Sequence, residues 1–117
     1  MVYQSVLTEL CQQVSGARGA AMLDSGGEIV VETHKGDEWL RLVGAYQAIA
    51  LASAARTAER YGSGPIRHLV SRYVGGTIIT RPLNDGYFLV LALSPEGSVA
   101  LAVHRSVAAC ERLNAEI

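Results

Sequence analysis

The sequence has 117 residues, the length of a single domain that can bury a substantial hydrophobic core. Apolar residues make up 50% of the chain and charged residues 18%, a composition that excludes intrinsic disorder. The 10 basic residues nearly balance the 11 acidic ones, giving a formal net charge of −1, and no run of like charge occurs, so nothing indicates a nucleic-acid-binding surface.

The sequence contains no recognisable membrane span or export signal. No apolar run approaches the roughly 18 residues that cross a bilayer, and the N-terminus lacks the basic region and cleavage site of a signal peptide. We therefore expect a cytoplasmic protein. The 2 cysteines, Cys11 and Cys110, fit this expectation, because small secreted domains usually carry more disulfides. Each cysteine falls on the apolar stripe of an expected helix, so both are expected to be buried free thiols.

The first part of the chain predicts a helix followed by a β-hairpin. Apolar residues recur with helical spacing from Tyr3 to Val14. Two short strands are expected next, at Gly19–Asp24 and Glu28–Thr33, joined by a glycine-rich turn. Alternation in the second strand predicts that Ile29 and Val31 lie on the same face of the sheet.

The longest expected element is a helix from Glu38 to Arg60. This stretch has no proline, is rich in alanine, leucine, glutamate and arginine, and follows Asp37, which is placed to cap the helix. At about 1.5 Å per residue, the helix would be roughly 35 Å long. Its apolar residues surround most of the circumference, so the helix needs cover on more than one side.

Three strands and a last helix complete the chain. The strands are expected at Ile66–Tyr73, Thr77–Leu83 and Tyr87–Leu93, separated by glycine-containing turns. The first is the most polar, as expected of an edge or interface strand, and the last is apolar throughout, as expected of a central strand. The final helix is expected at Ser98–Glu116, with a buried stripe of Val99, Ala102, Val103, Val107, Cys110 and Leu113.

These elements predict one α+β domain, residues 1–117, built as an α/β sandwich of stacked helix and sheet layers. The order α-β-β-α-β-β-β-α gives a five-stranded, largely antiparallel sheet. The long helix is expected to cover one face of the sheet and the two terminal helices the other. The sequence shows no internal repeat, low-complexity segment or second domain.

The sequence shows no catalytic, cofactor-binding or metal-binding pattern. The 3 histidines, His34, His68 and His104, lack the spacing that gathers two of them on one metal ion. The glycine turns lack the following helix and nearby lysine of a phosphate loop, since the one lysine of the chain is Lys35. We therefore expect a protein that works by binding, without a cofactor, and not an enzyme.

The composition of the long helix predicts a homodimer. Small residues recur near a spacing of four along it, which lets another helix approach closely. These residues are Gly44, Ala48, Ala52 and Ala55. The expected partner is the same helix of a second copy; the alternative is a monomer in which this helix is a central core element.

The order of elements and two sequence motifs resemble the roadblock family of dynein light chain-like domains. The first motif is GARGA at residues 16–20 followed by MLDSGG at residues 22–27, and the second is PLNDGYFLV at residues 82–90. The resemblance extends from residue 3 to residue 116. Profilin-like and PAS-like domains share part of this pattern.

The resemblance implies a non-enzymatic homodimeric scaffold with a roadblock/profilin-like fold. Roadblock domains pair their middle strands edge to edge and pack their two long helices side by side on one face. The implied dimer interface consists of Gly44, Ala48, Leu51, Ala52, Ala55, Ile66, His68, Val70 and Arg72. Bacterial members regulate small Ras-like GTPases, which implies a GTPase-binding surface at Glu38, Arg41, Arg56, Glu59 and Arg60.

Two other functions are compatible with the sequence. One is a small-molecule sensor of the PAS-like or profilin-like type, which needs a cavity lined by large side chains, whereas the chain offers 1 tryptophan, Trp39, and 1 phenylalanine, Phe88. The other is a structural dimerisation module in a signalling complex, which differs from a GTPase regulator in its partner and not in its surface.

Overall fold

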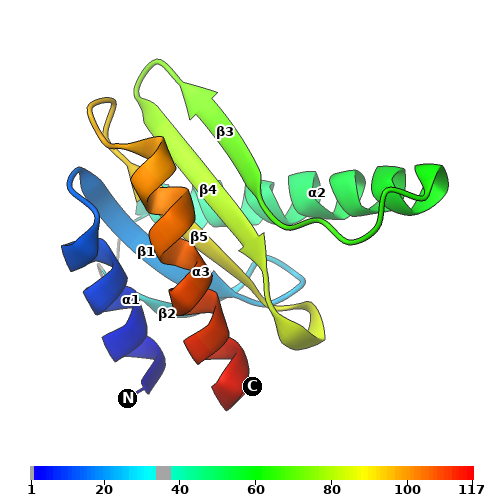
Figure 1. Ribbon diagram of the computed structural model, residues 1–117, viewed down its shortest axis with the longest axis horizontal. Coiled ribbons are helices and arrows are strands. Elements are labelled where there is room, and N and C mark those ends of the chain that lie inside the picture. Colours follow the sequence, from blue (N-terminus) through cyan, green and yellow to red (C-terminus); the bar gives the residue numbers. More distant parts are fainter. Residues whose placement is uncertain (1, 34–37) are drawn as a thin grey trace.

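Figure 1 shows the computed structural model of the protein, which describes residues 2–33 and 38–117. The helices are α1 (Val2–Gln13), α2 (Glu38–Tyr61) and α3 (Val99–Glu116). The strands are β1 (Ala17–Leu23), β2 (Ile29–Glu32), β3 (Leu69–Tyr73), β4 (Gly76–Pro82) and β5 (Phe88–Leu93), and a turn of 3-10 helix, η1 (Asn84–Gly86), joins β4 to β5. The predicted order of elements is confirmed. The predicted helix cap Asp37, together with His34 and Lys35, lies outside the described residues.

The strands form one antiparallel sheet in the order β2-β1-β5-β4-β3. Every residue of β5 is buried and the strand lies at the centre of the sheet, as predicted from its apolar sequence. β3 lies at one edge of the sheet, as predicted from its polar sequence.

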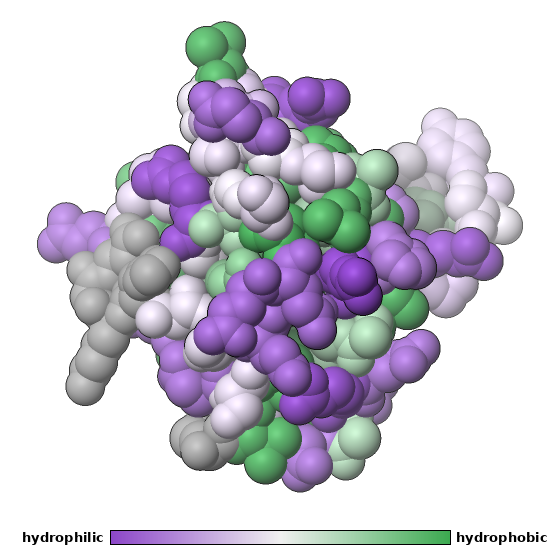
Figure 2. Space-filling view, turned by 60° about the vertical axis from the view of Figure 1, so that its left-hand side comes forward, coloured by the Kyte–Doolittle hydropathy of each residue, from purple (hydrophilic) through white to green (hydrophobic). Residues whose placement is uncertain are grey.

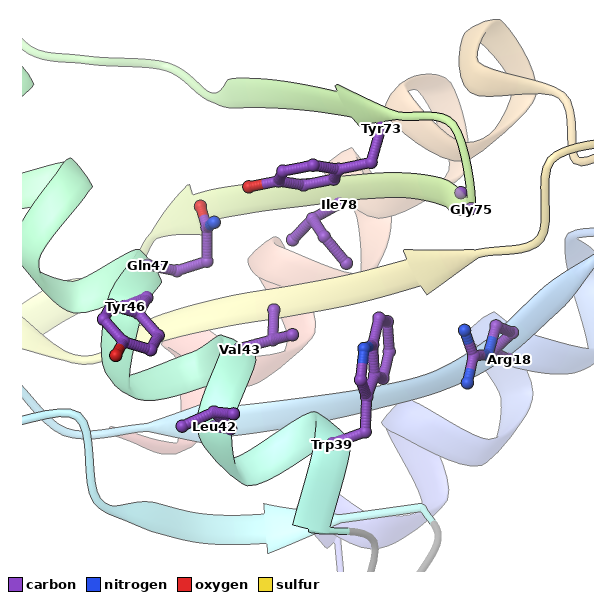
Figure 3. A pocket seen from close by; sticks show the side chains of 10 residues that line it. Arg18, Trp39, Leu42, Val43, Tyr46, Gln47, Tyr73, Gly75 and Ile78 are labelled. Atoms are coloured by element: carbon purple, nitrogen blue, oxygen red, sulfur yellow. The ribbon is translucent and has the colours of Figure 1, made fainter.

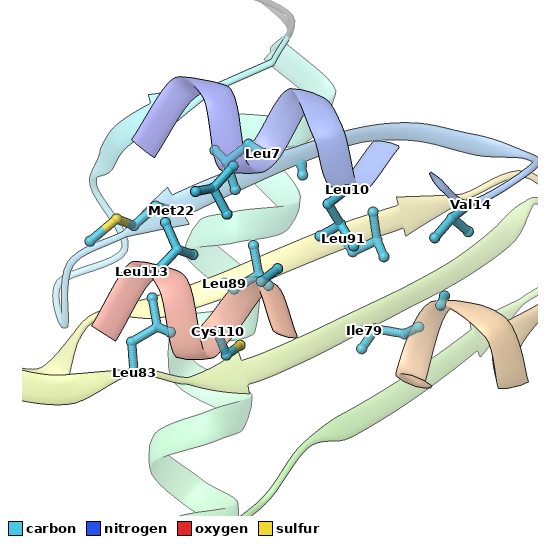
Figure 4. Packing of buried hydrophobic residues seen from close by; sticks show 14 of the residues in the cluster. Leu7, Leu10, Val14, Met22, Ile79, Leu83, Leu89, Leu91, Cys110 and Leu113 are labelled. Carbon is cyan, nitrogen blue, oxygen red and sulfur yellow. The ribbon is translucent and has the colours of Figure 1, made fainter. Parts of the chain in front are cut away.

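Helices cover both faces of the sheet, as predicted. α1 and α3 lie together on one face and bury the larger hydrophobic cluster, which includes Leu7, Leu91 and Leu113 (Figure 4). α2 lies on the opposite face, where Leu40 packs in a second cluster with Leu23 of β1 (Figure 1). Because β5 contributes residues to both clusters, it is the common centre of the two layers.

The buried stripe of α3 differs from the prediction at its middle. Val107 is 42% exposed, whereas Ser106 is fully buried, so the prediction that Val107 is buried is wrong. The Ser106 hydroxyl donates to the carbonyl oxygen of Val103 (2.8 Å) and accepts a hydrogen bond from Nε of Arg81 (2.6 Å). These bonds offset the cost of burying a hydroxyl group and fix the rotation of the helix.

A bulge in β2 overturns the predicted facing of that strand. Met22 pairs with Val31 but Leu23 pairs with Ile29, so Val30 is an extra residue in the ladder. Val31 therefore packs in the cluster beneath α1 and α3, and Ile29 packs against the cluster beneath α2. The prediction that Ile29 and Val31 share a face is wrong because the bulge breaks the two-residue period.

Side chains from two helices bind the end of β2. The carbonyl oxygen of Glu32 accepts a hydrogen bond from Nε2 of Gln4 in α1 (3.0 Å). The Glu32 carboxylate, which is almost fully buried, forms a salt bridge with Arg41 of α2 (3.3 Å). This edge of the sheet is thus attached to both helix layers.

Both cysteines are free thiols. Cys110 is buried beneath α3, as predicted, and Cys11 is only half-buried. Burial raises the pKa of Cys110 to about 11, against the opposing effect of the nearby Arg81 charge. Burial also raises the pKa of Cys11, so both thiols are protonated at neutral pH.

β3 begins at Leu69 and not at Ile66 as predicted. In the preceding segment, the carbonyl oxygen of Arg67 accepts a hydrogen bond from Nη1 of Arg81 (3.3 Å), and the other nitrogens of Arg81 bind to α3. Through Arg81, the Arg67 carbonyl is thus linked to α3. Ile66 and His68 consequently lie in the connection that precedes the strand.

Candidate functional site

The side of α2 that faces away from the sheet carries large apolar residues. Leu42 is 59% exposed, Tyr46 64% and Ile49 66%, although the opposite side of the same helix buries Leu40 and Gln47. The prediction of a helix that is apolar around most of its circumference is confirmed. An exposed apolar surface of this kind marks an interaction site in a soluble protein.

The side of the molecule on which α1 lies is more hydrophilic than the exposed side of α2. Viewed from the side on which α1 lies, hydrophilic residues cover most of the surface and hydrophobic residues form small, separate patches (Figure 2). The surface of α1 there includes a salt bridge between Glu9 and Arg112 of α3, both about half-exposed. Four of the large apolar side chains that are more than half exposed lie on α2, namely Leu42, Tyr46, Ile49 and Tyr61, so the candidate site is placed there.

The C-terminal part of α2 extends beyond the sheet. Figure 1 shows the helix crossing behind the strands and continuing past β3 into solvent. Between Ala52 and Tyr61 every residue is exposed or half-buried except Ala58, and Tyr61 at the end of the helix is 78% exposed. We call residues Ala50–Tyr61 the overhang. In the described part of the chain all of its residues are exposed except Leu51 and Ala54, which are half-buried, and Ala58, which is buried.

A groove of about 400 Å³ lies between α2 and the hairpin formed by β3 and β4 (Figure 3). Aromatic side chains form much of its wall, namely Trp39 and Tyr46 from α2 and Tyr73 from β3. The guanidinium carbon of Arg18, at the start of β1, lies 4.0 Å from the centre of the Trp39 ring, a cation–π contact. We call this the aromatic groove.

The floor of the aromatic groove is fixed from below. Gln47 and Ile78 line it. The side chain of Gln47 is buried, and its Oε1 accepts a hydrogen bond from the hydroxyl of Thr80, which is also buried (2.9 Å). This bond ties α2 to β4, so the groove is a preformed feature of the fold.

A second groove, of about 360 Å³, lies on the other side of α2, beside the turn between β4 and β5. Its lining has no charged residue. Five residues of the predicted dimer interface line it together: Ala48, Leu51, Ala52, Ala55 and Ile66. The structure therefore brings these five together, although the segments that carry them are separated in the sequence.

The other predicted interface residues lie elsewhere. Gly44 is buried against the sheet, where a Cβ atom would come within 2.4 Å of Cδ2 of Leu23, so it has no surface to offer a partner. Val70 and Arg72 are exposed on β3, and Val70 pairs with Ile79, which places it on the face opposite α2. His68 is half-buried before the strand begins.

The predicted GTPase-binding residues form two separate clusters along α2. Glu38 and Arg41 lie in the first turn, and Arg56, Glu59 and Arg60 line a polar groove near the C-terminal end. The helix rise of about 1.5 Å per residue separates Arg41 from Arg56 by roughly 22 Å. All five are exposed, but Arg41 already binds Glu32. Within one chain they do not form a single site.

The described part of the chain shows neither a metal-binding cluster nor a membrane-spanning helix. Among residues 2–33 and 38–117, no three histidine, cysteine, aspartate or glutamate side chains gather where they could hold a metal ion. None of the helices in these residues has the length and apolarity needed to cross a bilayer. The candidate site is therefore an apolar and aromatic protein surface with polar clusters at its ends.

The sequence-based prediction missed the aromatic groove. It considered tryptophan and phenylalanine as ring-binding residues, whereas Tyr46 and Tyr73 supply two of the three aromatic walls and Phe88 is in the core. The signal that would have found it is the spacing of Trp39, Val43 and Tyr46, which places them on one side of a helix.

Comparisons with known proteins identify the fold. A family model described as the Roadblock/LC7 domain matches residues 3–93. The solved Roadblock/LC7 domain from Streptomyces avermitilis superposes with a TM-score of 0.87 at 14% sequence identity, covering 97% of this chain and 95% of that one. MglB of Myxococcus xanthus superposes with a TM-score of 0.85 at 14% identity, covering 97% and 93%.

A further MglB structure, in a tetrameric arrangement, gives a TM-score of 0.84 at 18% identity and covers 97% of this chain and 85% of that one. A search of curated protein sequences found no match. At these identities the structural matches establish a shared fold.

Proposed function

Because the chain belongs to the Roadblock/LC7 domain family, we propose that it is a non-enzymatic scaffold: a homodimer that binds and regulates a small Ras-like GTPase. The observation that carries this proposal is the exposed apolar side of α2 next to the edge strand β3. The GTPase follows from what the roadblock resemblance implies, and MglB, a structural neighbour, occurs in a tetrameric arrangement.

The geometry of one protomer supports pairing about a two-fold axis. β3 is an edge strand of the described sheet, and it can pair with the β3 of a second copy. The overhang of α2 extends past that same edge, so a two-fold axis at β3 carries the overhang of one protomer over the sheet of its partner. Both exposed features are then covered by one contact.

The same pairing explains how separated charges form one surface. A two-fold axis perpendicular to α2 makes its two copies antiparallel. The cluster of Glu38 and Arg41 in one protomer then lies beside the cluster of Arg56, Glu59 and Arg60 in its partner. We propose that each GTPase-binding surface is composed of both clusters and is complete only in the dimer.

We expect the purified protein to sediment as a dimer at concentrations of about 1 μM, because exposed apolar residues on α2 leave water on association. Analytical ultracentrifugation over a dilution series measures this directly. A monomer at this concentration would contradict the homodimer and, with it, the composite GTPase surface.

The GTPase surface is tested by reversing one charge. Arg56 is exposed and forms no ion pair in the described part of the chain, so Arg56→Glu is expected to weaken GTPase binding by roughly tenfold while the dimer persists. Titration of the partner GTPase measures the affinity and sedimentation measures the dimer. Arg41 is a poorer choice, since reversal would place a second carboxylate beside Glu32.

Arg105→Glu is the matched control for this experiment. Arg105 is an exposed arginine on α3, on the opposite face of the sheet from α2, and its reversal makes the same change in net charge. We expect it to leave the affinity unchanged. Equal weakening by both variants would indicate a general charge effect, and no weakening by Arg56→Glu would remove the C-terminal cluster from the surface.

A small-molecule sensor is a second candidate function, favoured by the aromatic groove alone. The groove volume of about 400 Å³ falls within the range of ligand pockets, and aromatic residues line it. A ligand retained on purification would change the mass and absorbance of the native protein. If the mass and the absorbance are both unchanged and the protein forms a dimer, the result favours the scaffold.

A further inference from the structure

The floor of the aromatic groove presents a hydrogen-bond donor that the protein does not use. Gln47 is 4% exposed and lines the groove. Its Oε1 accepts the hydrogen bond from Thr80, but its amide nitrogen donates no hydrogen bond within residues 2–33 and 38–117. Figure 3 shows the Gln47 amide extending from α2 into the space beside Tyr73 and Ile78. This nitrogen is therefore available to an acceptor on a ligand in the groove.

The opposite end of the groove carries a positive charge, that of Arg18 (Figure 3). Arg18 is the one charged residue of the lining, and its side chain forms no ion pair or hydrogen bond within the described residues. The Trp39 ring, 4.0 Å from the guanidinium carbon, holds the cation at this end. A guanidinium binds a carboxylate or phosphate group through two parallel hydrogen bonds, so this end of the groove is complementary to an anion.

The space between the two polar ends suits a flat apolar ring. Trp39, Tyr46 and Tyr73 line it, and aromatic rings stack on one another or meet edge to face. The helix rise places Trp39 and Gln47 roughly 12 Å apart along α2. Two fused aromatic rings with a polar group at each end have a comparable length. The groove volume of about 400 Å³ accommodates such a molecule.

We propose that the aromatic groove binds a small planar aromatic anion. The carboxylate or phosphate group of the ligand lies on Arg18, its rings lie against the aromatic side chains, and an oxygen at its far end accepts a hydrogen bond from the Gln47 amide nitrogen. One protomer supplies every lining residue, so this inference goes beyond the homodimeric scaffold and does not depend on it. It gives the second candidate function, the small-molecule sensor, a class of ligand.

An apolar segment of another protein is a poorer occupant of this groove. It would remove both the Arg18 charge and the Gln47 amide nitrogen from water without giving either of them a partner. The two ends of the groove therefore select a ligand with an anionic group at one end and an acceptor at the other.

Three related compounds test the site. The compound 6-hydroxy-2-naphthoate carries both polar groups, 2-naphthoate lacks the hydroxyl group, and 2-naphthol lacks the carboxylate. We expect 6-hydroxy-2-naphthoate to bind most tightly and each of the other two to bind about tenfold more weakly. Trp39 is the one tryptophan of the chain, so its indole N–H gives a single signal in an NMR titration of nitrogen-15-labelled protein and reports binding in the groove.

Arg18→Gln tests the anionic end. Removal of the charge is expected to weaken binding of 6-hydroxy-2-naphthoate about tenfold and to change the affinity for 2-naphthol by less than about twofold. Arg105→Gln is the matched control, because Arg105 is exposed on α3, on the opposite face of the sheet, and is expected to leave all three affinities unchanged. Equal weakening by the two variants would overturn the assignment of the anion to Arg18.

The double variant Gln47→Met, Thr80→Val tests the other end. It replaces both partners of the buried hydrogen bond by apolar groups of similar size, so the fold is expected to persist, which circular dichroism verifies. The double variant is expected to bind 6-hydroxy-2-naphthoate no more tightly than 2-naphthoate. If the preference for the hydroxyl group survives in this variant, the assignment of Gln47 is wrong.

Sedimentation of the same samples separates this inference from the proposed scaffold. A dimer whose Trp39 signal moves with none of the three compounds overturns the ligand site and leaves the homodimer intact. A monomer that binds 6-hydroxy-2-naphthoate with the expected preferences supports the ligand site and contradicts the homodimer. A dimer that binds it with these preferences supports both.

Discussion

Gly76→Ala is expected to destabilise the fold by about 3 kcal/mol, a large fraction of the stability of a small domain. Gly76 opens β4 with a φ of +148°, a conformation that side-chain-bearing residues rarely adopt. A Cβ atom there would also come within 2.3 Å of the carbonyl oxygen of Leu93 in β5, and neither backbone can move without breaking the β4–β5 ladder. Urea unfolding followed by circular dichroism measures the change.

The neighbouring glycine supplies the control. Apart from its chain neighbours, no heavy atom of the described residues lies within 4 Å of the place that a Cβ atom on Gly75 would occupy, and its φ lies outside the left-handed region. Gly75→Ala is therefore expected to change the free energy of unfolding by less than about 1 kcal/mol. Similar losses for the two variants would show that the β4–β5 contact at Gly76 is not the cause.

Tyr46→Asp is expected to weaken the homodimer at least 100-fold, or about 2.8 kcal/mol, while each protomer stays folded. Tyr46 is 64% exposed in one protomer, so the substitution costs the isolated fold little. In the proposed homodimer the second copy covers this side of α2, and a carboxylate at position 46 is then buried without a cation. Sedimentation measures the dimer, and circular dichroism verifies the fold.

Ile49→Asp distinguishes the aromatic-groove side of α2 from the rest of the exposed helix. Ile49 is 66% exposed and apolar, but it lies outside the lining of the aromatic groove. The dimer is expected to survive this substitution. If Ile49→Asp dissociates the dimer and Tyr46→Asp does not, the protomers meet through a different side of α2.

Much of the architecture could be predicted from local sequence. The alternation of helical and strand periods predicted the three α-helices and five strands of the described residues, and the apolar run of β5 and the polar run of β3 predicted their central and edge positions. These features depend on the residues of one element and on how much of it must be buried, which the sequence records directly.

Three of the errors arose where a contact with a residue distant in the sequence determines the local structure. The bulge at Val30 depends on pairing with β1, and the burial of Ser106 depends on Arg81 of β4. The late start of β3 also depends on Arg81, which binds the segment before the strand. A pattern read along one element does not contain these partners.

The candidate site was predicted only in part, because the composition of an element gives its exposed surface but not the direction of each side chain. That α2 and β3 expose apolar and edge surfaces follows from their composition, and the structure confirms it. The direction of each side chain follows from how α2 sits on the sheet: Gly44 faces Leu23, while Trp39 and Tyr46 face the β3–β4 hairpin. Choosing interface residues of α2 by their small size therefore included the buried Gly44 and omitted the aromatic residues of the groove.

The two edge strands of the sheet, β2 and β3, differ in how readily each can pair with a strand of another chain. β2 is four residues long, is interrupted at Val30, and has its Glu32 carbonyl already taken by Gln4, so a further strand finds a poor template there. β3 is longer and regular in its pairing with β4. A sheet that can pair with another chain at only one edge forms a continuous sheet of two chains and then has no open edge for a third. Extension into a fibre is thereby avoided.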